Sequence, residues 1–220
     1  ADYGSRITGR GDTMAVLAEG TPFAAEALHG STVAFGSDEA SLFYAKGGLK
    51  AENQGFLQAA AKTVSIEAGS SGLAAEALKG SALTLGARNA EALGAQGELK
   101  AEDASSITGY GKTIALATDS TGYAAEALDA GTVALGSDES GVFYAKGELK
   151  AQNAGTLTAL AKNVSLEAGE THFASEAING GTVTLGTGGT GSAFTAQGEF
   201  KADYGSRITG RGDTMAVLAE

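Results

Sequence analysis

The sequence predicts an all-β solenoid, a fold in which one chain winds through stacked coils of short strands. Three observations support this prediction: the 220-residue chain repeats itself about every 50 residues, apolar residues alternate with other residues over short runs, and glycine recurs between the runs. Glycine occurs 34 times and proline once. That balance suits tight corners joining strands whose amide groups must all donate hydrogen bonds.

The repeat has three levels. A Lys-Ala dipeptide marks the main period, odd units share ITG-x-G, and even units share VSIEAG or VSLEAG. Residues 202–220 reproduce residues 1–19 without a change, so four units form a larger repeat of about 200 residues. The chain is therefore interpreted as one continuous β-solenoid over 1–220. Its units are 1–49, 50–99, 100–149 and 150–200, and 201–220 restarts the first unit.

Within each unit, the alternation predicts strand, corner, strand and corner. The anchors of the second unit begin at Val64, Leu83 and Leu99, and the next unit follows at Ile114. A polar or glycine-rich corner and a second apolar run follow each anchor. The anchor spacings of 19, 16 and 15 residues predict three coils per unit with two short strands per coil. Twelve coils would make the larger repeat a rod about 55–60 Å long.

Two alanine-rich stretches, AAEAL and LQAAAK, are also compatible with helix, because alanine has the highest helix propensity. Strand is favoured, since both stretches are short, bounded by glycine and in phase with clear strands. Left-handed or tight backbone is expected at the recurring corner glycines, which are Gly30, Gly80 and Gly180 in one set and Gly36, Gly86, Gly136 and Gly186 in another.

The charge pattern argues against nucleic-acid and membrane partners. The net charge is −11, and the 15 basic residues are scattered singly, so no stripe could neutralise phosphates. No apolar run reaches the 18 residues that a membrane-spanning helix needs. The first residues, ADYGSRITGRGDT, are not a signal peptide, so any targeting segment of a secreted protein is expected outside this piece.

Catalytic residues are not expected, because catalysis needs one asymmetric constellation and this chain repeats nearly the same sequence four times. His29 aligns with Lys79, Asp129 and Asn179, which indicates a position facing solvent, and His172 lies in a corner. The recurring acidic pairs are interpreted as solvated corners: Asp38 with Glu39, and Asp138 with Glu139.

Other ligand signals are weak, and no cofactor is predicted. One acidic pair supplies too few oxygens for calcium, so structural calcium is considered and not favoured. Among the outward pairs compared for ice binding, only Thr182 and Thr184 form a complete Thr-x-Thr. The integrin-type triplet Arg10-Gly11-Asp12, repeated at Arg211-Gly212-Asp213, is expected where a strand meets a corner. The sequon Asn163-Val164-Ser165 falls at the start of a strand.

Repeating charges are the strongest surface signal. The lysines are predicted to share one face, three coils or about 14 Å apart, and the glutamates are predicted to form a second row. Solvation of the sheet edges explains both rows, and lateral contact between lysine rows and glutamate rows of adjacent rods is the alternative. These candidate contact residues are Lys50, Lys100, Lys150, Lys201, Glu26, Glu76, Glu126 and Glu176.

Residues 147–169, GELKAQNAGTLTALAKNVSLEAG, resemble the haemagglutinin-type repeats of large secreted bacterial adhesins, the filamentous haemagglutinin class. The similarity extends along the whole chain as a shared pattern of glycine, alternating aliphatic residues and short polar corners. It implies a right-handed β-helix displayed outside a bacterial cell. The chain departs from the class in its sparse asparagine and its regular unit, and it also lacks the Gln and Asn ladders of curli-like fibre subunits, which it resembles in architecture.

The leading hypothesis is a structural segment of a long extracellular or cell-surface filament or adhesin stalk, not an enzyme. Its expected partners are itself, through coil stacking and lateral association, and a host or neighbouring-cell surface. The alternative is a flat-face binding module for carbohydrate, calcium or ice, and an enzyme built on a β-helix ranks third.

Overall fold

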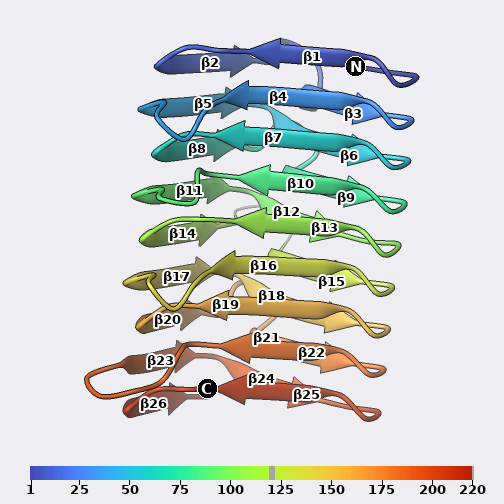
Figure 1. The fold of residues 1–220 in the computed structure, drawn as a ribbon. Coiled ribbons are helices and arrows are strands. Elements are labelled where there is room, and N and C mark those ends of the chain that lie inside the picture. The colour runs from blue at the N-terminus through green and yellow to red at the C-terminus, as the bar shows by residue number, and fades with distance from the viewer. Residues whose placement is uncertain (119–121, 220) are drawn as a thin grey trace.

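The structure is a computed structural model that describes residues 1–118 and 122–219, and it confirms the all-β solenoid (Figure 1). Three parallel sheets, A, B and C, run along the rod, and each complete coil contributes one strand to each sheet. Sheet A contains β1 (Arg6–Gly9), β4 (Thr32–Gly36), β7 (Phe56–Ala60), β10 (Ala82–Leu85), β13 (Ser106–Gly109), β16 (Thr132–Gly136), β19 (Thr156–Leu160), β22 (Thr182–Leu185) and β25 (Arg207–Gly210).

The other two sheets follow the same order along the rod. Sheet B contains β2 (Thr13–Leu17), β5 (Leu42–Lys46), β8 (Thr63–Glu67), β11 (Ala92–Gln96), β14 (Thr113–Ala117), β17 (Val142–Lys146), β20 (Asn163–Glu167), β23 (Ala193–Gln197) and β26 (Thr214–Leu218). Sheet C contains β3 (Phe23–Leu28), β6 (Gly48–Glu52), β9 (Leu73–Leu78), β12 (Glu98–Ala101), β15 (Tyr123–Leu128), β18 (Glu148–Gln152), β21 (Phe173–Ile178) and β24 (Glu199–Ala202).

Each 50-residue unit contains two coils of three strands. Successive strands of sheet A begin at Arg6, Thr32, Phe56 and Ala82, and each of these residues pairs with the next. The coils therefore span 26, 24 and 26 residues in turn. The prediction of three coils per unit with two strands per coil is wrong, because alternation locates strands but does not show which corner returns the chain to the same sheet. Eight coils make the larger repeat about 38 Å long, in place of 55–60 Å.

A single glycine turns the chain from sheet B to sheet C in every second coil. Gly97 has a φ of 118°, and a Cβ there would overlap the Ala68 methyl group and lie 2.7 Å from the Gly72 carbonyl oxygen. Gly47, Gly147 and Gly198 occupy the equivalent places. Because one residue makes this turn, the apolar run from Leu42 to Glu52 looks continuous in the sequence but forms strands in two sheets.

The turn from sheet C to sheet A has a different geometry. Two consecutive residues adopt left-handed backbone there, for example Lys79 and Gly80 with φ of 55° and 71°, and Asn153 and Ala154 with φ of 52° and 61°. The amide of Gly80 donates to the Asp103 carbonyl oxygen of the next coil at 2.9 Å. The corner glycines expected from the sequence do have positive φ, and they are Gly30, Gly36, Gly80, Gly86, Gly136, Gly180 and Gly186.

Large and small side chains alternate between coils to fill the narrow core. Phe43 and Phe143 are fully buried from sheet B. The inward residues of sheet C also alternate in size, with Leu49, Leu99 and Leu149 in one set of coils and Ala75 and Ala125 in the coils between them. The stretch AAEAL lies in β9, and the LQAA part of LQAAAK lies in β7, so both form strands as predicted, because their alanines fit this limited space. No helix that could cross a membrane occurs in 1–118 or 122–219.

Replacing Gly97 with alanine is expected to lower the free energy of unfolding by about 2 kcal/mol or more, because its φ and the Ala68 methyl group both oppose a Cβ. Gly80→Ala is the matched control. Nothing lies within 4 Å of a Cβ at Gly80, and the equivalent residues Ala104, Ala130 and Ala154 already adopt this conformation. Urea denaturation should separate the two variants, and equal destabilisation would contradict the corner geometry.

Candidate functional site

The predicted lysine and glutamate rows form one column on the outer face of sheet C. Strand pairing places Lys50 between Glu26 and Glu76, and Lys150 between Glu126 and Glu176. The charge therefore changes sign at every coil, and lysines recur every second coil, about 9.6 Å apart. The prediction of two separate rows, with lysines three coils apart, is wrong because the coil count was wrong. The column runs Glu26, Lys50, Glu76, Lys100, Glu126, Lys150, Glu176 and Lys201.

The column forms ion pairs within one chain. Lys150 Nζ lies 3.7 Å from Glu126 Oε1, and Lys201 Nζ lies 2.7 Å from Glu176 Oε1. Burial alone would lower the pKa of Lys50, but its hydrogen bond to Glu52 and the nearby Glu76 carboxylate raise that pKa above its usual value. Within the chain these charges pair along the rod axis. The hypothesis that they also contact a neighbouring rod stays a prediction.

Aromatic side chains lie beside the lysines of this column. The Nζ atom of Lys150 lies 4.9 Å from the centre of the Tyr123 ring, and that of Lys50 lies 5.3 Å from the centre of the Phe23 ring. Attraction between an ammonium group and a ring face strengthens when both are partly desolvated. The lysine side chains are thereby held against sheet C, with 15% of the Lys150 side chain exposed.

Glu148 is a carboxyl group of this face whose environment strongly opposes ionisation. It is 1% exposed, and its Oε1 atom has no hydrogen-bond partner among the described residues. Burial raises the pKa of Glu148 to about 7, and the nearby Thr171 hydroxyl and Lys150 counter this only in part. Glutamate recurs at the equivalent positions Glu98 and Glu199, and glycine occupies the fourth at Gly48, but the sequence alone does not show that Glu148 is buried.

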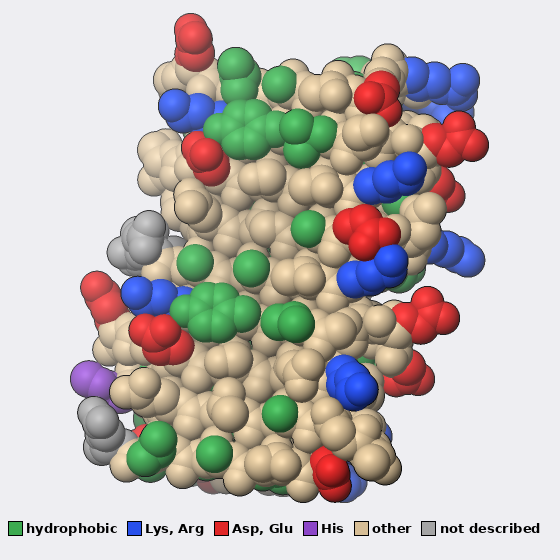
Figure 2. All heavy atoms as spheres, turned by 90° about the vertical axis from the view of Figure 1, so that its left-hand side faces the viewer, with side chains coloured by type: hydrophobic (Ala, Val, Ile, Leu, Met, Phe, Trp, Pro, Cys, Tyr) green, Lys and Arg blue, Asp and Glu red, His purple; other side chains and the backbone are tan. Residues whose placement is uncertain are grey.

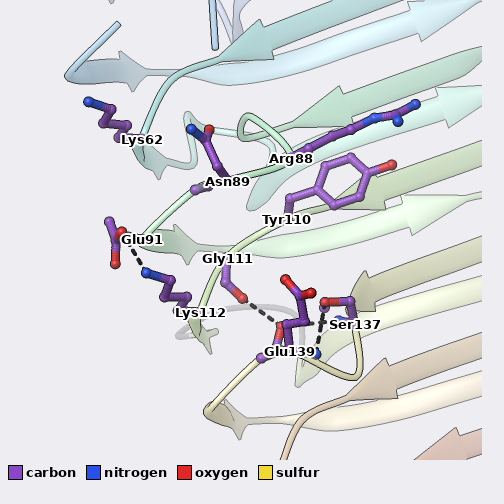
Figure 3. Close-up of a pocket in the computed structure, with 12 residues that line it drawn as sticks. Lys62, Arg88, Asn89, Glu91, Tyr110, Gly111, Lys112, Ser137 and Glu139 are labelled. Atoms are coloured by element: carbon purple, nitrogen blue, oxygen red, sulfur yellow. Dashed lines mark hydrogen bonds and ion pairs between the residues drawn. The ribbon is translucent and has the colours of Figure 1, made fainter. Parts of the chain in front are cut away.

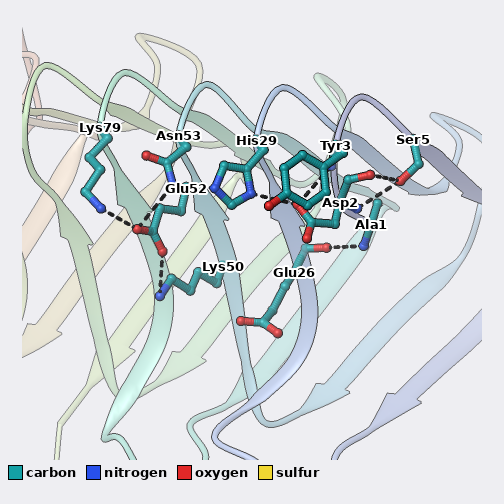
Figure 4. Close-up of polar contacts among 10 residues, drawn as sticks. All are labelled: Ala1, Asp2, Tyr3, Ser5, Glu26, His29, Lys50, Glu52, Asn53 and Lys79. Carbon is teal, nitrogen blue, oxygen red and sulfur yellow. Dashed lines mark hydrogen bonds and ion pairs between the residues drawn. The ribbon is translucent and has the colours of Figure 1, made fainter.

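A second polar column follows the turn from sheet C to sheet A (Figure 4). The rings of Tyr3 and His29 stack with centroids 4.8 Å apart, and His29 Nδ1 lies 2.7 Å from Asp2 Oδ1. One coil further along, Lys79 donates to Glu52 at 2.6 Å, and this bond lowers the pKa of Glu52. His29 is exposed, as its alignment predicts, and so is His172.

The turn from sheet A to sheet B contains a shallow hollow of about 320 Å³ (Figure 3). Arg88, Tyr110 and Glu139 line it, and an ion pair of 2.8 Å joins Lys112 to Glu91 at its rim. The acidic pairs Asp38-Glu39 and Asp138-Glu139 are exposed in these turns, as predicted. No group of three or more metal-ligating side chains occurs within residues 1–118 and 122–219.

The tripeptide and the sequon lie where the sequence places them. Arg10-Gly11-Asp12 joins β1 to β2, and Asp12 Oδ1 accepts a hydrogen bond from the Ser41 hydroxyl at 2.7 Å. Its copy at Asp213 accepts a hydrogen bond from the Gly191 amide at 3.1 Å. Asp12 thus contacts the next coil of the rod, and Asp213 contacts the previous one. Asn163 is the first residue of β20.

The outer faces of sheets A and B differ from that of sheet C. The strands of sheet A from β4 to β22 contain no charged residue, and threonines occupy both outward positions at Thr156 and Thr158 and at Thr182 and Thr184. These two pairs lie in adjacent coils, which the sequence comparison missed because it examined only every second coil. Sheet B presents mostly small side chains between charged margins (Figure 2).

No protein-family model, curated protein or solved structure matches this chain.

Replacing Lys150 with methionine is expected to lower the free energy of unfolding by about 2–3 kcal/mol, because it leaves the Glu126 and Glu176 carboxylates without their central cation. Lys112→Met is the control, since 63% of the Lys112 side chain is exposed and such pairs contribute less than about 1 kcal/mol. Denaturant titration at pH 7 tests both variants. A Lys150 variant as stable as the control would contradict a structural role for the column.

Glu148 should make stability fall as pH rises from about 4.5 to about 7. In that window the folded protein retains the Glu148 proton that the unfolded chain has released, so the folded state binds more protons. The Glu148→Gln variant should therefore gain stability relative to the wild type as pH rises through this range. Glu91→Gln, at an exposed site, should track the wild type. Parallel curves for wild type and Glu148→Gln would refute the assignment.

Proposed function

We propose that this chain is a structural segment of a long, repetitive filament or adhesin stalk that extends by stacking of coils. One observation supports this most directly, namely that the larger repeat closes without a change of register. Strands β25 and β26 carry the same residues as β1 and β2. Arg207 pairs with Thr182 on one side of this sequence, and its copy Arg6 pairs with Thr32 on the other.

The same closure holds in sheet B. Met215 pairs with Phe194, and its copy Met14 pairs with Phe43. The sequence of the first coil therefore occurs twice, before the second coil and after the eighth coil, and it pairs in the same register in both places. A tandem array of this repeat would continue as a straight stack of coils, because nearest-neighbour contacts are all that a solenoid requires.

An extracellular or cell-surface location is part of the proposal, in line with the resemblance to adhesin repeats. The main partner would be the chain itself, and a host or neighbouring-cell surface would be contacted by the stalk. A non-enzymatic role is supported by candidate groups that repeat from coil to coil, such as the charged column. Association of rods side by side through that column stays a prediction.

A flat-face binding module is the second candidate. Seven successive strands of sheet A without a charged residue favour it, as do the adjacent pairs of outward threonines. Such a face suits a flat, ordered and uncharged ligand, such as ice or a crystalline carbohydrate. Thermal hysteresis that disappears in a Thr158→Lys, Thr184→Lys double variant would support this candidate over a purely structural role.

The filament proposal predicts the length of a longer chain. Residues 1–201 placed directly before residues 1–220 should form one rod about 38 Å longer than the single chain, since eight coils are added. Small-angle X-ray scattering measures this increase in maximum dimension. As a control, a flexible Gly-Ser linker between the two copies should give a broad distribution of shapes. A folded-back, thicker particle from the direct fusion would contradict the proposal.

A further inference from the structure

We infer that the two identical segments of this chain are interchangeable, so that residues 1–19 of one copy take the place of residues 202–220 of another, and join the copies end to end, once docking of the latter segment is weakened. The inference rests on the proposed function, because both require the repeat to close in register. It adds a docking surface, which is the edge of the eighth coil that β22, β23 and β24 present once residues 202–220 have left it. The occupant of this surface is the first coil of a second copy.

The structure already contains this occupant in place. Residues 202–219 rest on the eighth coil, where Ile208 pairs with Val183 and Val217 pairs with Ala196. Residues 1–19 have the same sequence, so they can make the same contacts in the same register. In the chain as it stands, Ile7 is the first inward residue of the rod and is 47% exposed. Its equivalent in the fifth coil, Ile107, is fully buried.

Sheet C shows where the two chains would meet. The amide of Leu28 donates to the Ala1 carbonyl oxygen at 3.0 Å, and the Ala1 amine donates to the Glu26 carbonyl oxygen at 2.8 Å. Ala1 is the copy of Ala202, which follows Lys201 at the edge of β24. Residue 1 of the second copy therefore takes the place of residue 202 of the first, directly after Lys201.

The charged column is complementary at this junction. It ends with a lysine at one end of the rod and with a glutamate at the other, and 46% of the Lys201 side chain is exposed. Docking β3 of the second copy beside β24 of the first would place Glu26 next to Lys201, as Glu76 lies next to Lys50 within the chain. The alternation of charge would continue across the boundary, and no like charges would face each other.

Exchange is favoured only when the docking of residues 202–220 on their own chain is weakened. In sheets A and B, the incoming segment makes the contacts that the displaced segment gives up, so these terms cancel. The new strand pair between β24 and β3 is the gain, and it is opposed by the entropy of association. The covalently attached segment 202–220 also competes at a high effective concentration. Weakening this segment alone should therefore favour assembly.

The two copies of one isoleucine allow a matched test in the full chain. Ile208→Asp places a charge in the last coil and disfavours its docking, while eight coils remain intact. Ile7→Asp makes the same change in the segment that would dock. Ile208→Asp should form rods whose mass grows with concentration in analytical ultracentrifugation. Ile7→Asp and the double variant should remain monomeric. A monomeric, folded Ile208→Asp chain at high concentration would overturn the inference.

Cysteine trapping identifies the contact, because the chain has no cysteine. Thr184 pairs with Thr209, the copy of Thr8, so Thr184→Cys in one Ile208→Asp chain should form a disulfide with Thr8→Cys in another. Within one chain these positions are seven coils apart, about 34 Å. Thr108→Cys, whose strand is paired on both edges, is the control partner. Equal trapping of Thr108 and Thr184 would refute the docking site.

The two tests distinguish failure of the exchange from failure of the filament proposal. If the covalent two-repeat chain forms one long rod and Ile208→Asp stays monomeric, the exchange is refuted and the filament proposal stands. If the two-repeat chain folds back on itself, the closure in register is refuted, and both proposals fall with it.

Discussion

The paired strand residues of this rod stack on their equivalents in neighbouring coils, at the strand spacing of about 4.8 Å. This in-register stacking turns each position of the sequence into a column, and the chemistry of each column must be compatible with close repetition. Like charges would repel along sheet C, and the sequence avoids this by alternating lysine with glutamate at every coil. Large residues would collide in the core, and sheet C accordingly alternates leucine with alanine along Leu49, Ala75, Leu99, Ala125 and Leu149. Both the 50-residue unit and its division into two unlike coils follow from these requirements.

The sequence predicts the fold class, the strands and the exposed corners, because alternation and glycine spacing are local signals. It does not predict the grouping of strands into coils, since Gly97 makes a whole corner alone while longer runs of polar residues make others. That error separated Glu26 from Lys50, which are neighbours in the structure, and hid the alternating column. The raised pKa of Glu148 was also hidden, because it depends on burial of the side chain by residues distant in the sequence.

All strands of a sheet run in the same direction, and sheet C has different strands at its two edges. One end presents the edge of β24 with Lys201, and the other presents the edge of β3 with Glu26. The outer charges of sheet C are mostly paired within the chain, and the strands of sheet A between β4 and β22 have no charge to pair. In the proposed filament, growth along the axis would have partners in every sheet, whereas contacts from the sides would meet an uncharged, threonine-rich face. This division of roles is what the proposed stalk requires.

The distance between spin labels at Thr8→Cys and Thr209→Cys tests the central claim most directly. These equivalent positions lie at the two ends of sheet A, on β1 and β25, eight coils apart. Two coils per 50-residue unit predict a narrow distance distribution centred near about 38 Å. Three coils per unit would place the labels about 58 Å apart, and that distance, or a broad distribution, would contradict the stacking on which the filament, the charged column and the exchange of ends all depend.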